Sequence, residues 1–239
     1  MPTMDKDRLC DSAVSGEPLV LLPGMNCTPD LWTGCGLVGA ITPALAETTV
    51  DRQVDRLLDS LPRRFALVGF SLGGVVAMSL CRRAPERVAR LCLMSTNAKA
   101  PTPAQRAGWQ SWRDRLAAAE TPYSLQQGIL SALSSEPARL RDPDIADRLL
   151  RMADHIGAGQ LDAQLQMQES RIDESRTLGL LRMPVLLISG TADVICPPVF
   201  HQAIAAIIPG AQLASVRAGH VVPMERPGEV GRLIKQWAR

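Results

Sequence analysis

Four short apolar runs, separated by longer stretches with helical patterning, constrain the fold of this chain most strongly. The runs span Leu19–Leu22, Phe65–Phe70, Val88–Met94 and Val185–Ser189, and they are rich in Val, Leu and Ile without polar alternation. Such runs are typical of parallel strands that are covered on both faces. A weaker strand is expected at Gln212–Val216. The pattern therefore predicts an α/β fold with a mostly parallel central sheet flanked by helices.

Helices are expected between and after these strands. Amphipathic spacing or proline and glycine boundaries place them at Val50–Leu61, Leu72–Arg83, Pro197–Ile208 and Pro227–Trp237. One more short strand is expected at Val38–Ile41.

The segment from residue 97 to 181 differs from the rest because it has no strand-like run. It carries helical patches, which we place at Ala104–Ala119, Ser124–Leu133, Asp144–Ile156 and Gln160–Ile172. An all-helical insert between two parallel strands indicates a lid over the carboxyl edge of the sheet. The expected organisation is a core in two parts, residues 1–96 and 182–239, with a helical cap at 97–181.

Composition excludes several classes of function. The 239 residues carry 26 Lys and Arg against 24 Asp and Glu, a net charge of +2, without basic blocks, so nucleic acid is not an expected partner. The first 17 residues contain four acids and no apolar run long enough for a signal peptide or a membrane span, so a cytoplasmic location is expected. The six cysteines form no CxxC pair and read as buried apolar residues or free thiols: Cys10, Cys27, Cys35, Cys81, Cys92 and Cys196.

A G-x-S-x-G sequence follows the second apolar run directly and precedes a predicted helix. It reads Gly69-Phe70-Ser71-Leu72-Gly73. A serine on a sharp strand-to-helix turn projects its hydroxyl group, and the flanking glycines remove side chains that would collide there. The helix that follows offers unpaired N–H groups that stabilise negative charge. Ser71 is therefore the candidate nucleophile, and the alternative is a glycine-rich turn that buries a serine.

A serine hydroxyl needs a neighbouring base, and the chain offers three histidines. His220 follows the last predicted strand and precedes the last helix, where a base is expected to lie. His155 falls within a helical patch, where packing or surface exposure is the simpler interpretation. For His201, in the first turns of the Pro197 helix, exposure or helix capping is the simpler interpretation.

Asp193 is the candidate acid that orients the histidine. It follows the Val185–Ser189 run at the edge where open α/β sheets bind ligands. Its alternative role is an N-terminal cap for the helix at Pro197. After the Val88–Met94 run the chain offers no carboxylate, because it reads Ser95-Thr96-Asn97.

The order and spacing of four motifs resemble the α/β-hydrolase fold superfamily with a helical cap. The motifs read PLVLLPGMN, GFSLGG, PVLLISGTADVICPP and AGHVVPMERP, within residues 18 to 238. The resemblance implies that the backbone N–H groups of Met25 and Leu72 form an oxyanion hole. It also implies a leading hairpin that is short or absent, and structural roles for Glu225 and Pro227. A serine rather than an aspartate at this strand-to-helix turn, the nucleophile elbow of the family, favours acyl transfer over dehalogenase or epoxide hydrolase chemistry.

The expected function is a serine hydrolase that cleaves a carboxylic ester or thioester of a small to medium apolar acyl group through an acyl-enzyme. The chain is similar to small bacterial-type carboxylesterases and to carrier-protein methyl ester esterases, so the substrate is a small molecule that a carrier could present. No metal or organic cofactor is implied, and a monomer or homodimer is expected. Candidate acyl-pocket residues are Trp109, Trp112, Tyr123, Leu133, Met152 and Met167, each of which could instead be core between lid helices.

Three alternatives stay open at this point. The same fold supports C–C bond hydrolysis, lactone opening, perhydrolysis and acyl transfer in biosynthesis. It also occurs in slow-turnover ligand sensors and in non-catalytic partner proteins, since a fold does not fix a function. The complete set of candidate serine, histidine and acid argues against the non-catalytic alternative.

Overall fold

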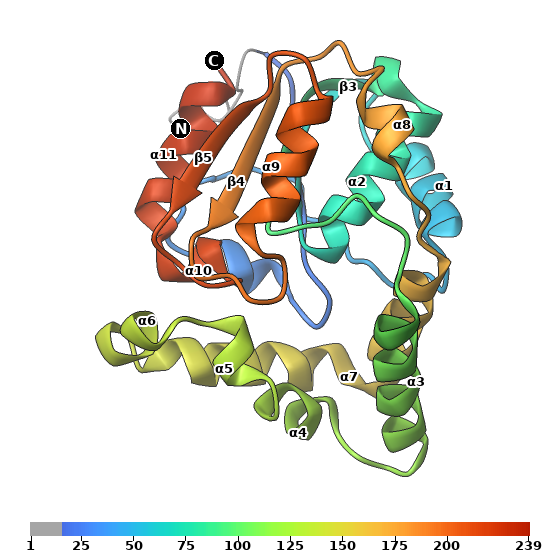
Figure 1. Ribbon diagram of the computed structural model, residues 1–239, viewed down its shortest axis with the longest axis vertical. Coiled ribbons are helices and arrows are strands. Elements are labelled where there is room, and N and C mark those ends of the chain that lie inside the picture. The colour runs from blue at the N-terminus through green and yellow to red at the C-terminus, as the bar shows by residue number, and fades with distance from the viewer. Residues whose placement is uncertain (1–15) are drawn as a thin grey trace, which may run out of the picture.

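The computed structural model describes residues 16–239, and within them five strands form one parallel sheet (Figure 1). The strands lie side by side in chain order: β1 (Leu19–Leu22), β2 (Phe65–Phe70), β3 (Val88–Met94), β4 (Val185–Gly190) and β5 (Gln212–Val216). The predicted α/β class and all five of these predicted strands are confirmed, with β4 one residue longer than expected.

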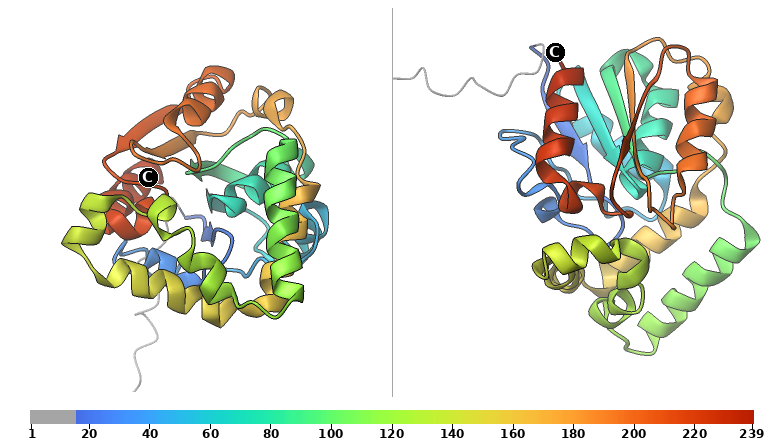
Figure 2. Two further views of the ribbon diagram at one scale, coloured as in Figure 1. Left: turned by 60° about the horizontal axis from the view of Figure 1, so that its bottom comes forward. Right: turned by 60° about the vertical axis from the view of Figure 1, so that its left-hand side comes forward.

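Helices cover both faces of the sheet, as the right-hand view of Figure 2 shows. Helices α1 (Val50–Ser60), α2 (Leu72–Arg83) and α9 (Pro198–Ile207) each connect two neighbouring strands. Because crossovers between parallel strands are right-handed and the strands follow one another in chain order, these helices share one face. Helix α11 (Pro227–Trp237) follows the last strand and covers the opposite face.

The apolar core has two parts, one on each face of the sheet, and alternate residues of each strand belong to different parts. Leu67 and Leu187 pack among residues of α1, α2 and α9. Val68 and Ile188, one position further along the same strands, pack among residues of α11. Successive strand residues point to opposite faces, so apolar runs without alternation are what a sheet buried on both sides requires.

The chain between β3 and β4 forms helices only, and all but the last of them lie beyond the end of the sheet at which the strands finish (Figure 1). They are α3 (Pro103–Ala117), α4 (Pro122–Gln127), α5 (Leu130–Leu133), α6 (Glu136–Arg141), α7 (Asp144–Ser170) and α8 (Ser175–Leu178). The two patches predicted on either side of Gly157 form the single helix α7, which is interrupted at that glycine (φ 75°).

Four further differences from the sequence expectation are local. Ile41 makes only an isolated parallel bridge with Val20, so the strand predicted at Val38–Ile41 is absent. Gly36 and Gly39 have positive φ angles (65° and 78°), which break an extended conformation there. The patch predicted at Ser124–Leu133 is divided near Gly128 into α4 and α5. Helices α6 and α8 are not predicted, and nor are the short elements η1 (Pro29–Trp32), η2 (Pro85–Arg87) and α10 (Val222–Glu225).

The cysteines of the described part are buried and unpaired, as predicted: Cys27, Cys35, Cys81, Cys92 and Cys196. Burial raises the pKa of the Cys27 and Cys81 thiols to about 12, so both stay protonated at neutral pH. The predictions for Cys10 and for the absence of a signal peptide concern residues 1–15, which lie outside the described residues. From residue 16 onward, no helix has the length and hydropathy needed to cross a membrane.

Candidate active site

Ser71 occupies a strained turn between β2 and α2. Its backbone has φ 51° and ψ −114°, a conformation that non-glycine residues rarely adopt. Hydrogen bonds hold this turn: the Ser71 N–H donates to the carbonyl of Met94 (2.9 Å), and the Thr96 hydroxyl donates to the carbonyl of Ser71 (2.8 Å). Strain of this kind costs about 1–3 kcal/mol and persists where the surroundings fix it. The turn presents the serine hydroxyl at the end of the sheet.

The two glycines of the G-x-S-x-G sequence are required by close backbone approach. A Cβ atom on Gly69 would lie 2.5 Å from the carbonyl oxygen of Gly73. A Cβ atom on Gly73 would collide with the carbonyl oxygen of Leu22, at the end of β1. No side chain fits at either position, which is the packing reason expected from the sequence.

His220 and Asp193 meet Ser71 at this edge of the sheet. The Nε2 atom of His220 lies 3.0 Å from the Ser71 Oγ atom, and its Nδ1 atom lies 2.9 Å from Asp193 Oδ2. A carboxylate can only accept, so the histidine donates from Nδ1 and offers Nε2 as acceptor for the serine hydroxyl. His220 and Asp193 are buried, and the Phe70 ring lies against the imidazole with 5.2 Å between ring centroids. The three side chains form one continuous hydrogen-bonded chain.

Asp193 also organises the loop that carries it. Its Oδ1 atom accepts hydrogen bonds from the backbone N–H groups of Ile195 (2.9 Å) and Cys196 (2.8 Å), ahead of α9. The loop is tied to the His220 loop, because the Ala192 N–H donates to the carbonyl of Ala218 (2.9 Å). Asp193 therefore fills both expected roles: Oδ1 accepts from backbone N–H groups ahead of α9, and Oδ2 faces the histidine.

The backbone N–H groups of Met25 and Leu72, both near Ser71, have no protein acceptor within the described residues. Leu72 begins α2, where first-turn N–H groups are unpaired. The residue after Met25 is fixed: buried Asn26, at φ 59°, donates from its backbone N–H to Gln164 (2.8 Å) and from its side chain to Gln126 (3.0 Å). Residues of α4 and α7 thus hold the loop that follows β1.

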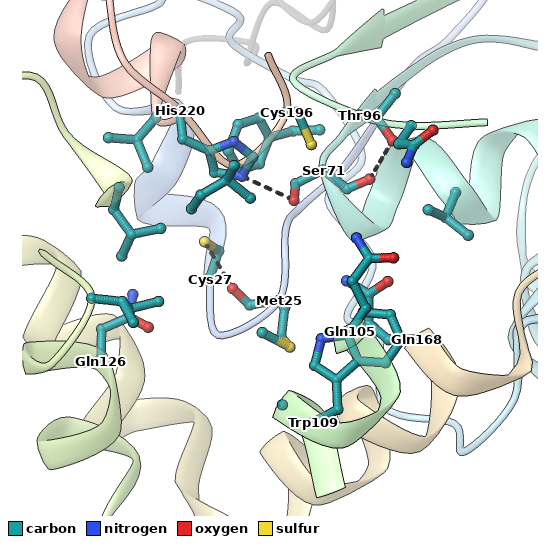
Figure 3. Close-up of a pocket in the computed structure, with 18 of the residues that line it drawn as sticks. Met25, Cys27, Ser71, Thr96, Gln105, Trp109, Gln126, Gln168, Cys196 and His220 are labelled. Carbon is teal, nitrogen blue, oxygen red and sulfur yellow. Dashed lines mark hydrogen bonds between the residues drawn. The ribbon is translucent and has the colours of Figure 1, made fainter. Parts of the chain in front are cut away.

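A cavity of about 330 Å³ opens beside Ser71 and His220, as Figure 3 shows. Its wall combines residues of the core with residues of α3, α4, α5 and α7, and most of the side chains are apolar or uncharged. They are Met25, Cys27, Phe70, Ser71, Val75, Thr96, Asn97, Gln105, Gly108, Trp109, Trp112, Gln126, Ile129, Leu133, Leu149, Gln168, Arg171, Ile195, Cys196, Phe200, His220 and Val221.

The structure places the six predicted acyl-pocket residues in two groups. Trp109, Trp112 and Leu133 line the cavity. The other three lie outside it: Tyr123 is 42% exposed, while Met152 and Met167 are buried within the two core clusters. Periodicity locates such residues on a helix but does not show which neighbour the helix meets, so these three are removed from the candidate pocket wall.

The two remaining histidines differ from one another. His155 is exposed, in agreement with the surface interpretation. His201 is fully buried and accepts a hydrogen bond from the Thr96 N–H at its Nε2 atom (3.3 Å), so the expectation of an exposed or capping residue is wrong. Burial lowers the pKa of His201 to about 4, which keeps its ring neutral.

Some residues around the site carry no signal in the sequence pattern. Thr96, Gln126 and Gln164 hold the two loops described above, and they come from distant parts of the chain. Glu225 accepts from the Gly219 N–H (3.0 Å) and from Ser135, so it supports the His220 loop, in keeping with the structural role implied for it. Within residues 16–239, no group of three or more His, Cys, Asp or Glu side chains is placed to hold a metal ion.

Comparison with known proteins agrees with the observed fold. Residues 24–227 match the family described as "alpha/beta hydrolase fold". The chain is 30% identical to the pimeloyl-[acyl-carrier protein] methyl ester esterase of Aromatoleum aromaticum, over 92% of this chain and 98% of that protein. Among solved structures, it is similar to a thermophilic esterase from Thermogutta terrifontis (TM-score 0.84, 25% identity, 93% of this chain and 89% of that one).

A third similarity concerns the fold alone. The enol-lactonase from Burkholderia xenovorans LB400 superposes with a TM-score of 0.80 at 20% identity, covering 92% of this chain and 91% of that one. Taken together with the parallel sheet and the serine elbow, these matches show that the chain belongs to the α/β hydrolase fold family. It is a serine hydrolase of the esterase class, as the sequence predicts.

Proposed function

We propose that Ser71, His220 and Asp193 form the catalytic triad of an esterase that works through an acyl-enzyme. The observation that carries the proposal is the hydrogen-bonded chain from Asp193 through His220 to the Ser71 hydroxyl, with distances of 2.9 and 3.0 Å. Such a chain lets a weak nucleophile lose its proton as it attacks.

In the first half of the reaction, Ser71 Oγ attacks the ester carbonyl carbon while its proton moves to His220 Nε2. Asp193 stabilises the imidazolium that forms. The backbone N–H groups of Met25 and Leu72 donate to the developing oxyanion, which fits their lack of a protein acceptor. The tetrahedral intermediate then collapses, and the leaving alcohol or thiol takes the proton from Nε2. Water repeats these steps on the acyl-enzyme and releases the acid.

Residues 97–181 form the cap in this proposal, inserted between core residues 1–96 and 182–239. Support comes from the cavity wall, where residues of this segment face Ser71 from α3, α4, α5 and α7. Trp109, Trp112 and Leu133 give the wall an apolar character that suits a small to medium acyl group. The cavity volume of about 330 Å³ sets the upper size of the group that it encloses.

A substrate presented by a carrier protein is a further part of the proposal. The relative from Aromatoleum aromaticum, of which 98% is covered by the match, has a name that specifies a methyl ester on an acyl-carrier protein. The test compares one methyl ester in two thioester forms, one on a small thiol free in solution and one on an acyl-carrier protein, so that the two forms differ only in the carrier. A higher kcat/KM for the form on the carrier protein supports this part, and equal values contradict it.

The triad is tested by Ser71→Ala, with Ser189→Ala as the matched control. Ser189 is buried in β4, and its hydroxyl has no hydrogen-bond partner within the described residues, so its loss leaves the site untouched. Turnover of p-nitrophenyl esters is expected to fall by about 10³-fold or more in Ser71→Ala. Covalent labelling by a fluorophosphonate should also disappear in that variant alone. Retained turnover in a folded Ser71→Ala protein would refute the mechanism.

A further inference from the structure

Arg171 is a buried cation in the wall of the active-site cavity. It follows α7 directly, only 8% of its surface is exposed, and it lines the same cavity as Ser71 and His220. No other Arg or Lys, and no Asp or Glu, lines this cavity within the described residues. The cavity wall therefore carries one fixed positive charge, that of Arg171. The imidazole of His220 is the histidine ring that also lines this cavity.

Neutral partners hold the guanidinium group in place. Its Nη1 atom donates to Gln168 Oε1 (3.1 Å) and its Nη2 atom donates to Gln105 Oε1 (2.8 Å). It also stacks over the Trp109 ring at 5.1 Å from the centroid. Figure 3 shows these three partners, Gln105, Gln168 and Trp109, in the cavity wall. The Nε–H group is buried and has no acceptor among the described residues.

The surroundings of Arg171 contrast with those of Arg82, a less buried arginine nearby. Arg82 forms an ion pair with buried Glu174 at 3.0 Å. Arg171 has no carboxylate within ion-pair distance in the part of the chain that the structure describes. A buried charge without a counter-charge is costly, and burial lowers the pKa of Arg171 accordingly. Five N–H groups in a planar fork suit a carboxylate, and two of the five are occupied by glutamine oxygens.

We propose that Arg171 binds a carboxylate carried by the substrate, so that the preferred substrates are esters that also have a free acid group. The proposal rests on the proposed esterase function of the same cavity. A single guanidinium balances the single charge of a carboxylate, and a dianionic phosphate would leave one charge unbalanced. A purely structural role, linking α3 to α7 through the two glutamines, is the competing interpretation.

The test compares two series of methyl esters matched in chain length. One series consists of monomethyl esters of dicarboxylic acids, and in the other a methyl group replaces the free carboxylate. The wild-type enzyme is expected to hydrolyse the acid series with about 10- to 100-fold higher kcat/KM, the range for a hydrogen-bonded charge pair. Equal rates in the two wild-type series overturn the proposal, whatever the variants do.

The variants are Arg171→Met and Arg171→Lys, with Arg106→Met as control. Arg106 is an exposed cation on α3 that lies outside the cavity wall. Arg171→Met should lose the preference for the acid series, because kcat/KM falls much more for that series than for the neutral series. Arg171→Lys should keep part of the preference, and Arg106→Met all of it. An equal fall in both series for Arg171→Met, accompanied by lower thermal stability, assigns the residue a structural role and refutes the proposal.

Two further readouts separate this proposal from the proposed function. Failure of the wild-type enzyme to hydrolyse either series, or to react with a fluorophosphonate, counts against the esterase function itself. Hydrolysis of the neutral series with no gain from a carboxylate counts against the Arg171 proposal alone. Alkyl carboxylates should also inhibit turnover of the neutral series better than alkyl phosphates of equal length, and the reverse order contradicts the choice of a carboxylate.

Discussion

Glu225 connects the His220 loop to the helices that follow β3, and its replacement should affect both stability and activity. Its Oε1 atom accepts from the backbone N–H groups of Gly219 (3.0 Å) and Ser135 (3.0 Å), and its Oε2 atom accepts from the Ser135 hydroxyl (2.6 Å). Glu225 and Gly219 are both buried, so water replaces these bonds poorly. Glu225→Ala would leave two backbone N–H groups without an acceptor.

The expected cost follows from those two groups. Each unsatisfied buried donor costs about 1–3 kcal/mol, and Ser135 is only half-buried, so Glu225→Ala should lower the free energy of unfolding by about 3 kcal/mol. Glu225→Gln keeps an acceptor oxygen in place and should cost about 1 kcal/mol. Because Gly219 precedes His220, kcat/KM should fall at least about tenfold in the alanine variant at a temperature where it is folded.

Urea unfolding and p-nitrophenyl ester turnover measure these two effects. Glu229→Ala is the control, since Glu229 lies nearby on α11 and makes no side-chain hydrogen bond within the described residues. Its unfolding free energy should change by less than about 0.5 kcal/mol. Equal costs for Glu225→Ala and Glu225→Gln, or a cost below about 1 kcal/mol for the alanine variant, would refute the reasoning.

Two further predictions concern the buried histidine and the tryptophans of α3. The folded-state pKa of His201 is about 4, below the unfolded value of about 6.5, so the unfolded state binds more protons between these values. The contribution of neutral His201 to stability is therefore complete above about pH 6.5 and is lost as pH falls toward 4. In urea unfolding, the free energy of unfolding of His201→Gln should fall less steeply over this pH range than that of the wild type. The same pH dependence in both proteins would contradict this prediction. Trp109→Ala and Trp112→Ala should each move the preferred p-nitrophenyl ester to a longer acyl chain, at a cost below about 2 kcal/mol because both side chains are partly exposed. A cost of about 3–5 kcal/mol with unchanged preference would assign them to the core instead.

The sheet and the meeting of Ser71, His220 and Asp193 could be predicted from the sequence because each depends on a local pattern. A strand covered on both faces requires a continuous apolar run, and β1, β2, β3 and β4 all show one. Gly69 and Gly73 flank Ser71 because the backbone approaches closely there. Parallel strands end at one edge, so residues that follow different strands could be expected to meet.

The cavity wall was less accessible because it depends on how helices are oriented in space. Met152 and Met167 share α7 with Leu149 and Gln168, but only the latter two line the cavity, although Leu149 packs in the same core cluster as Met152. The apolar spacing along one helix does not show which of its residues line the cavity and which pack only in the core. Arg171 shows the same limit, because its partners Gln105 and Gln168 become neighbours only after α3 and α7 pack together.

The helices beyond the sheet differ in how firmly they are held, and this difference predicts where substrate enters. Helices α4 and α7 are bonded to the core through Asn26, which donates to Gln126 and Gln164 in a buried environment. Separating them from the core would break these bonds, at about 1–3 kcal/mol for each buried group left unsatisfied. In contrast, no residue of α3 is buried.

Local opening favours elements with few buried residues, so α3 should move away from the cavity while α4 and α7 stay in place. In hydrogen exchange followed by mass spectrometry, amides of α3 should exchange faster than those of the α7 segment around Gln164. Labelling of Ser71 by a bulky fluorophosphonate should slow the exchange of α3, because Trp109 and Trp112 would then contact the bound group. Equal protection of α3 and α7 in the free enzyme would place the entrance elsewhere.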